Sequence, residues 1–217
     1  MSNTSAQTQE FFHSYAGDFN AIYSSRNGVI ANLINRTLRR SMRLRYIKTL
    51  EGCTPVAGRS VLDVGCGPGH YGIALARQGA ARVTGIDFAE GMIELARRQA
   101  QATGVAGRCD FRIGDFQQYR PAKPFDYVVV MGVMDYVRDP VPLVKHVVSL
   151  TGRRAFFSFP VGGGLLAWQR KLRYRSRCPL FFYSRADVEK VFAGIDGIAV
   201  RVDRIARDFF VTVEKRA

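Results

Sequence analysis

Apolar residues gather in short runs between residues 60 and 160, and segments with helical spacing separate the runs. The runs with the length and apolar character of buried strands lie at 60–64, 82–86, 109–113, 127–131 and 154–159. Helices are predicted between them, over 71–78, 89–103 and 141–150. Strands that alternate with helices, and that are apolar nearly throughout, predict a parallel sheet covered by helices on both faces.

The segment before this alternation is predicted to be helical. Two helices are expected over 5–24 and 29–50, and their separation from the sheet is marked by a Gly- and Pro-containing linker at 51–58. In the second helix apolar residues recur at roughly helical spacing, and arginines fill much of the opposite face. We therefore expect a helical segment that is distinct from the sheet.

The segment after the alternation differs again. After Pro160, residues 161–184 are predicted to form an insertion with a glycine hinge, a basic amphipathic helix and an aromatic stretch. A last helix is predicted at 185–192. Two strands near 197–204 and 208–214 come next, and they are close enough in sequence to form a terminal hairpin.

Composition and charge narrow the class of protein. The chain has 217 residues, of which 47% are hydrophobic, and this suits one domain with a substantial core. The net charge is +14, with basic clusters within 36–48 and 170–177. A field of this sign attracts nucleic acid, anionic lipid or phosphorylated substrates, whereas the simpler interpretation is a solvated basic helix face. No RNA-binding signature accompanies the charge.

Targeting and redox signals are sparse. Residues 1–12 show no basic end followed by an apolar region, so no signal peptide is expected. The apolar run VVVMGVM is far shorter than the roughly 20 residues that cross a membrane. The four cysteines are scattered without a Cys-x-x-Cys pair, so we expect free thiols, no metal site and a cytoplasmic location.

A glycine-rich loop comes after the first predicted strand, within VLDVGCGPGHYG (61–72). Counted from Gly65 the loop is G-x-G-x-G, and counted from Gly67 it is the dinucleotide pattern G-x-G-x-x-G. A dinucleotide loop should begin its tight turn where the strand ends, which is at Gly65, and its third glycine position is then His70. The strand end therefore favours the first register, and a nicotinamide cofactor is the minor alternative.

Acidic residues or glycines stand at the end of each of the first four predicted strands. Asp63 and the glycine loop end the first strand, and Asp87 ends the second, where a carboxylate can accept hydrogen bonds from ribose hydroxyls. Asp115-Phe116 comes after the third strand, where the carboxylate can accept a hydrogen bond from an adenine amino group and the ring can stack on the adenine. Met131-Gly132 ends the fourth strand. Because right-handed crossovers bring the carboxyl ends of parallel strands to one edge, we expect one ligand site there.

The segments VLDVGCGPG, VTGIDFAEGMIELAR, IGDF and FDYVVVMGVMDYV resemble, in this order, the successive motifs of class I S-adenosylmethionine-dependent methyltransferases. The resemblance covers roughly residues 58–160. It implies an α/β fold with a Rossmann-like seven-stranded sheet, mostly parallel with an antiparallel last strand. To this sheet the residue pattern adds N-terminal helices and a basic insertion before the last helix. Residues 1–50 would form a helical lid segment, and 51–217 the S-adenosylmethionine-binding domain with its insertion at 161–184.

The resemblance implies S-adenosyl-L-methionine as cofactor and S-adenosyl-L-homocysteine as product. The glycine loop would run past the methionine part of the cofactor, and Asp87 would bind its ribose. Phe88 and Met92 would lie beside its adenine. The implied cofactor-binding residues are Asp63, Gly65, Cys66, Gly67, Gly69, Asp87, Phe88, Met92, Asp115, Phe116, Met131 and Gly132.

The residues after the fourth predicted strand narrow the class of acceptor. They include neither the Asn/Asp-Pro-Pro-aromatic run of amino-group methylases nor a Pro-Cys, which favours a small-molecule acceptor and O-methylation. The family commonly has Glu-His where this chain has Asp135-Tyr136. We expect Tyr136, Asp135 and His13, which an N-terminal lid could bring to the acceptor, to shape the reaction centre.

The flanking segments show a looser resemblance to magnesium-protoporphyrin O-methyltransferases and to methyltransferases of surface-polysaccharide pathways. The basic insertion suits an anionic or sugar-linked acceptor, and the positive net charge suits a transient contact with an anionic membrane surface. Two alternatives stay open: an RNA methyltransferase that uses the basic face, and a scaffold that binds the cofactor without chemistry.

Overall fold

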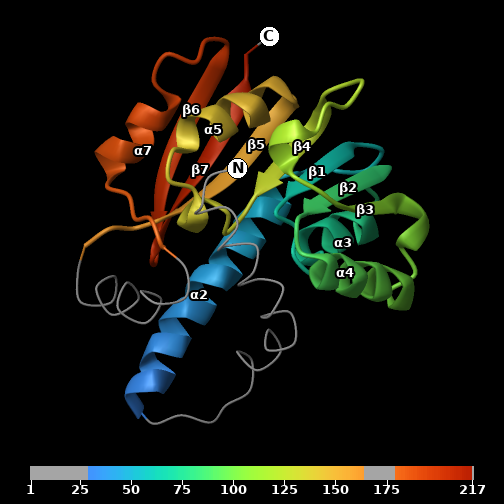
Figure 1. The fold of residues 1–217 in the computed structure, drawn as a ribbon, viewed down its shortest axis with the longest axis horizontal. Coiled ribbons are helices and arrows are strands. Elements are labelled where there is room, and N and C mark those ends of the chain that lie inside the picture. The colour runs from blue at the N-terminus through green and yellow to red at the C-terminus, as the bar shows by residue number, and fades with distance from the viewer. Residues whose placement is uncertain (1–28, 164–178, 217) are drawn as a thin grey trace.

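The computed structural model describes residues 29–163 and 179–216, with side chains from residue 40 onward. One seven-stranded sheet organises the fold, in the order β3-β2-β1-β4-β5-β7-β6 (Figure 1). Neighbouring strands among β1 to β5 are parallel, and β7 runs antiparallel to both β5 and β6. This confirms the predicted fold class. The strands are β1 Ser60–Val64, β2 Arg82–Asp87, β3 Cys109–Ile113, β4 Phe125–Val130, β5 Thr151–Pro160, β6 Ile198–Ile205 and β7 Asp208–Lys215.

The helices also agree with the predicted pattern. They are α2 Val29–Gly52, α3 His70–Arg77, α4 Glu90–Ala102, α5 Pro140–Ser149 and α7 Arg185–Phe192, with short 3-10 turns η2 Ala106–Arg108, η3 Phe116–Gln118 and η4 Met134–Tyr136. The boundaries differ from the predicted ones by up to three residues, as at Thr151, where β5 begins before residue 154. The helix predicted over 5–24 and the basic part of the insertion, 164–178, lie outside the described residues.

The sheet separates two hydrophobic cores, because successive side chains of a strand point to opposite faces. Phe156 and Phe157 are neighbours on β5, yet they belong to different cores. Phe157 packs with residues of α5 and α7, including Leu143 and Val188, whereas Phe156 lies in the core that includes Leu75 of α3. This alternation is what a parallel sheet with helices on both faces requires.

Helix α2 packs against α3 and lies along β5 and β6, and Ser41 bonds to Asp208 of β7, so polar as well as apolar side chains fill the seam between α2 and the sheet. Ser41 and Thr49 are buried at 1% and 0% exposure, and Arg45 is half-buried, whereas Tyr46 is exposed. The arginine-rich face of this helix is therefore not solvated throughout, since Arg45 is half-buried. At the end of the helix a Cβ on Gly52 would overlap the ring of Phe156, so glycine lets α2 reach the sheet.

Local capping sets several element boundaries near the sheet edge. Asp139 caps α5 by accepting a hydrogen bond from the Val141 amide, and Pro140 occupies the first helical turn. Ser184 and Asp187 form a reciprocal capping box at the start of α7. Among the described residues, no helix is both long and apolar enough to cross a bilayer.

Candidate active site

The strand ends that carry predicted site residues lie side by side at the carboxyl edge of the sheet. The register pairs Asp63 of β1 with Gly85 of β2 and with Val129 of β4, and it pairs Asp87 with Ile113 of β3. The segments that come after β1, β2, β3 and β4 therefore start side by side. One edge holds the glycine loop, the second acidic strand end, the Asp115-Phe116 turn and the Met131-Gly132 turn.

The glycines of the loop are required by backbone conformation and by crowding. Gly65, Gly67 and Gly69 have φ values of 63°, 50° and 81°, in the region that favours glycine. A Cβ on Gly65 would come within 2.6 Å of Val133 Cγ2, and one on Gly69 within 2.8 Å of the Phe111 ring. Beside Gly67 nothing lies within 4 Å of such a Cβ, so the loop is open there for a ligand to approach its backbone.

Most amides of this loop donate hydrogen bonds inside the protein. The N–H groups of Gly65 and Cys66 donate to the Ile86 carbonyl at 2.8 and 3.1 Å. Gly69 N–H donates to the Cys66 carbonyl at 3.0 Å. Gly67 N–H donates to Asp87 Oδ2 at 2.9 Å. The loop therefore does not present these amides as donors to a ligand, as a phosphate-binding loop does.

Asp87 ties the glycine loop to the second strand. Its Oδ2 accepts from Gly67 N–H and its Oδ1 accepts from Ala89 N–H, each at 2.9 Å. Burial raises the pKa of this carboxyl, and the backbone hydrogen bonds act in the opposite direction. Each carboxylate oxygen can accept a further hydrogen bond. The half-buried side chain could therefore accept hydrogen bonds from two hydroxyls of a bound ribose.

Asp63 and Cys66 support the loop from the protein interior. Asp63 is 1% exposed, and its Oδ2 accepts from Gly72 N–H at 3.1 Å. Burial raises the pKa of Asp63 to about 7. The Cys66 thiol is also buried, which raises its pKa. The structure gives both side chains a role in shaping the loop, and their contact with a cofactor stays a prediction.

The predicted adenine-side residues differ in exposure. Asp115 is exposed, and its carboxylate caps η3 by accepting from Gln117 N–H at 2.9 Å. Phe116 is 7% exposed, with its ring centroid 4.8 Å from that of His146. Met92 is 2% exposed and Phe88 is half-buried. Asp115 and Phe88 are thus the more accessible members of this group.

The predicted reaction centre lies directly after β4. Gly132 has φ +75°, and its N–H donates to Ser158 Oγ at 2.8 Å. Asp135 is only 3% exposed, and its carbonyl accepts from Phe181 N–H at 2.9 Å, so the loop is anchored to the segment before α7. Met131 and Tyr136 are half-buried at the same edge. His13 lies outside the described residues, and the roles of all these side chains stay predictions.

Sequence reasoning missed Arg45, which α2 carries to the same edge. Its side chain is 13% exposed, and Nη1 donates to Ser158 Oγ at 3.2 Å. The same nitrogen lies 3.8 Å from where a Cβ on Gly132 would stand. Burial raises the pKa of Tyr71 to about 12, and the nearby Arg45 charge acts in the opposite direction. No local signal in the sequence distinguishes Arg45 from the other arginines of this helix.

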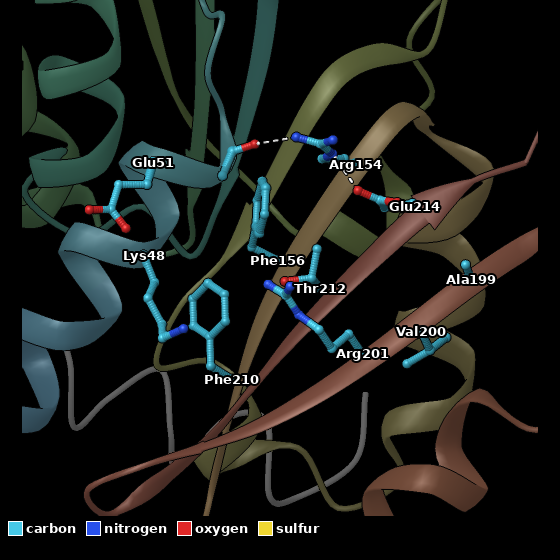
Figure 2. A pocket seen from close by; sticks show the side chains of 11 residues that line it. Lys48, Glu51, Arg154, Phe156, Ala199, Val200, Arg201, Phe210, Thr212 and Glu214 are labelled. Atoms are coloured by element: carbon cyan, nitrogen blue, oxygen red, sulfur yellow. Dashed lines mark hydrogen bonds and ion pairs between the residues drawn. The ribbon is translucent and has the colours of Figure 1, made fainter.

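A cavity of about 410 Å³ lies elsewhere, between the last turns of α2 and the β5-β7-β6 face (Figure 2). Phe156 and Phe210 line it, with three cationic side chains around them. Arg154 pairs with Glu214 at 2.7 Å, while Lys48 and Arg201 pair with Asp203 at 3.5 and 3.4 Å. Each of these cations has a carboxylate partner within the protein, two of them sharing Asp203, and the cavity faces the amino-terminal half of β5 rather than the glycine loop.

Comparison with known proteins agrees with this arrangement. Residues 61–151 match the family described as Methyltransferase domain. A ubiquinone biosynthesis O-methyltransferase from Neisseria meningitidis is 40% identical over 112 residues, covering 50% of this chain and 45% of that protein. One from Coxiella burnetii is 34% identical over 120 residues, covering 54% and 49%. The chain thus spans about half the length of the curated relatives it matches.

Solved structures share the fold over nearly the whole chain. The magnesium protoporphyrin IX methyltransferase from Synechocystis PCC 6803 with bound SAH has a TM-score of 0.80 at 22% identity, covering 98% of this chain and 100% of that one. The DhpI-SAM-HEP complex has a TM-score of 0.69 at 18% identity, covering 99% of each chain. The predicted resemblance is confirmed: residues 61–151 form a methyltransferase domain, on the fold of the class I S-adenosylmethionine-dependent methyltransferases.

Proposed function

We propose that this chain transfers a methyl group from S-adenosyl-L-methionine to an oxygen of a small-molecule acceptor. The observation that carries the proposal is the convergence of four successive strand ends at one edge. They bring together the open glycine loop, Asp87, the Asp115-Phe116 turn and the Gly132 turn. The relatives named as ubiquinone biosynthesis O-methyltransferases support O-methylation.

The hydrogen bonds of the loop favour this cofactor over a dinucleotide. A pyrophosphate needs N–H donors, but the amides of Gly65, Cys66, Gly67 and Gly69 already donate within the protein. The carbonyl oxygens of the loop each have a second lone pair, and such acceptors suit the ammonium group of an amino acid. Close to Gly132, the Arg45 guanidinium is placed to bind a carboxylate. The two charges of a methionine end are thus matched.

The chain's own residues would mainly bind and orient the reactants. The cofactor supplies a methyl group on a positively charged sulfur. Holding an acceptor oxygen in line with that methyl group supplies much of the rate enhancement. A hydroxyl acceptor must also lose a proton to a positioned base, and Tyr136, Asp135 and His13 are our candidates for shaping that step.

Calorimetric titration with S-adenosyl-L-homocysteine tests the cofactor site. We expect the wild type to bind and Asp87→Asn to bind at least about 100-fold more weakly, since the ribose loses charge-assisted hydrogen bonds. Asp110→Asn is the matched control, because Asp110 lies on the adjacent β3 and pairs with Arg82 and Arg112 instead. A wild type that does not bind, or an Asp87 variant that binds as tightly, would refute the proposal.

The acceptor is proposed to be anionic or sugar-linked. The net charge of +14 raises the local concentration of anions at the protein. The protein should be incubated with labelled cofactor and three acceptors: a neutral phenol, and two anionic compounds, magnesium protoporphyrin and a nucleotide-linked uronic acid. Transfer to an anionic member supports this assignment, and transfer only to a neutral one contradicts it. Cofactor binding without transfer to any acceptor in fractionated lysate would favour the non-catalytic scaffold.

We also propose that α2 touches an anionic membrane surface transiently. Its outer face carries exposed Arg40 and Arg43, beside Tyr46 and Ile47 at 36% and 37% exposure. Cations next to exposed apolar side chains suit an anionic interface. Vesicles containing phosphatidylglycerol should sediment the protein and phosphatidylcholine vesicles should not. Persistent sedimentation of the Arg40→Glu/Arg43→Glu variant would contradict the assignment to α2.

A further inference from the structure

One buried hydroxyl joins α2 to the turn after β4. Ser158 lies near the carboxyl end of β5 and is 0% exposed. Its Oγ accepts from Gly132 N–H at 2.8 Å and from Arg45 Nη1 at 3.2 Å. These two contacts come from segments that are far apart in sequence. A single side chain therefore sets how the Arg45 guanidinium stands relative to the Gly132 turn.

The guanidinium is also held from its other side. Arg45 Nε lies 3.5 Å from Oδ2 of Asp208, the first residue of β7. Ser41 Oγ donates to the same oxygen and accepts from Arg207 N–H at 3.4 Å. Ser41 and Asp208 are 1% and 4% exposed. Because these polar groups are buried, their geometry is fixed by the surrounding fold rather than by solvent.

We propose that Ser158 is a positioning residue for the amino-acid end of the cofactor. The inference rests on the proposed function, which places that end between Arg45 and Gly132. In this proposal Ser158 does not touch the cofactor; it holds both groups in one relative arrangement, while Asp208, itself bonded to Ser41, pairs with Arg45 on the other side. The adenosine part, which lies toward Asp87 and Asp115, does not depend on it.

Two ligands separate positioning from general structural support. S-Adenosyl-L-homocysteine carries the amino acid, and 5′-methylthioadenosine keeps the adenosine and the sulfur but lacks the amino acid. In Ser158→Ala we expect binding of the first to weaken at least about ten-fold, because hydrogen bonds to a charged group lose their geometry. Binding of the second should stay within about two-fold of the wild type by the same reasoning. Both dissociation constants are measured by calorimetry.

Thr151→Val is the matched control. Thr151 is the other buried hydroxyl residue of β5 and is 2% exposed, but its Oγ1 donates to the Val147 carbonyl at 2.7 Å, at the opposite end of the strand. Its loss should lower the unfolding temperature and leave both dissociation constants unchanged. Ser158→Cys keeps the size and offers a weaker acceptor, so it should fold even if the alanine variant does not and should show the same selective loss.

Unchanged affinity for S-adenosyl-L-homocysteine in the folded Ser158 variants would overturn the inference. Equal weakening of both ligands would overturn it too, because a purely structural role affects the whole site. A wild type that binds neither ligand would instead refute the proposed function, and the inference with it. If the wild type binds both ligands but Ser158→Ala shows no selective loss, only this inference fails and the proposed function stands.

Discussion

Replacing Asp208 with Asn tests whether a buried ion pair holds α2 on the sheet. The Asp208 side chain is 5% exposed, and Arg45, 3.5 Å away, is 13% exposed. Asn keeps the shape and removes the charge, which leaves the guanidinium without its counter-ion. Removing one partner of a buried pair typically costs about 3–5 kcal/mol. Because Arg45 keeps its Ser158 contact and some solvent, we expect the free energy of unfolding to fall by about 2–4 kcal/mol.

Asp203→Asn supplies the comparison, since it is the same chemical change on the neighbouring strand β6. Asp203 pairs with Lys48 at 3.5 Å, but the two side chains are 33% and 35% exposed. Pairs this open contribute about 0–1 kcal/mol. Urea unfolding followed by circular dichroism gives both free energies. Similar losses in the two variants would show that burial does not set the strength of the α2 contact.

Three further changes probe the loop, its acid and the acceptor side. Burial raises the Asp63 pKa from 3.8 to about 7, so between these pH values the folded state retains a proton that the unfolded state releases. The free energy of unfolding should therefore fall as pH rises from about 4 to 7. In thermal unfolding scans, Asp63→Asn should make this pH dependence weaker. Gly65→Ala should abolish measurable binding of S-adenosyl-L-homocysteine through backbone strain and the clash with Val133. Gly107→Ala, where nothing lies within 4 Å of the added Cβ, should bind it normally. Tyr183→Phe removes the hydroxyl that donates to the Val137 carbonyl at 2.9 Å and should raise the acceptor KM with cofactor affinity unchanged; a cofactor defect would contradict this.

The sheet could be predicted because its signals are local. Each parallel strand is a short apolar run, and glycines such as Gly79 and Gly104, with φ of 98° and 71°, end the intervening helices. The strand-end acids Asp87 and Asp115 could be placed at one edge for the same reason, since topology alone brings them there. The motif residues needed no knowledge of packing.

The α2 seam could not be predicted in this way. Arg45 stands among many arginines, and nothing local marks it as the one whose charge is buried. Its burial depends on Asp208 and Ser158, which belong to strands that pair only in the folded sheet. Similarly, the sequence predicts that Asp135 comes directly after the fourth strand, but its 3% exposure depends on the neighbouring segment around Phe181. Periodicity reports which face is apolar, and it does not report polar partners from distant segments.

The same contacts explain how the site obtains its shape without a ligand. Gly67 N–H is held by Asp87, Gly72 N–H by Asp63 and Gly132 N–H by Ser158, so three glycine amides each donate to a buried or half-buried side chain. Glycine loses more conformational freedom on folding than other residues do, and these fixed acceptors help to hold the three glycines in place. These amides are therefore committed to building the wall of the site. Under the proposed function, the groups left for a ligand are hydrogen-bond acceptors, namely the remaining lone pairs of the carboxylates and the backbone carbonyls, together with the Arg45 guanidinium. Acceptors suit the hydroxyls of a ribose and the ammonium of an amino acid, and they repel a pyrophosphate.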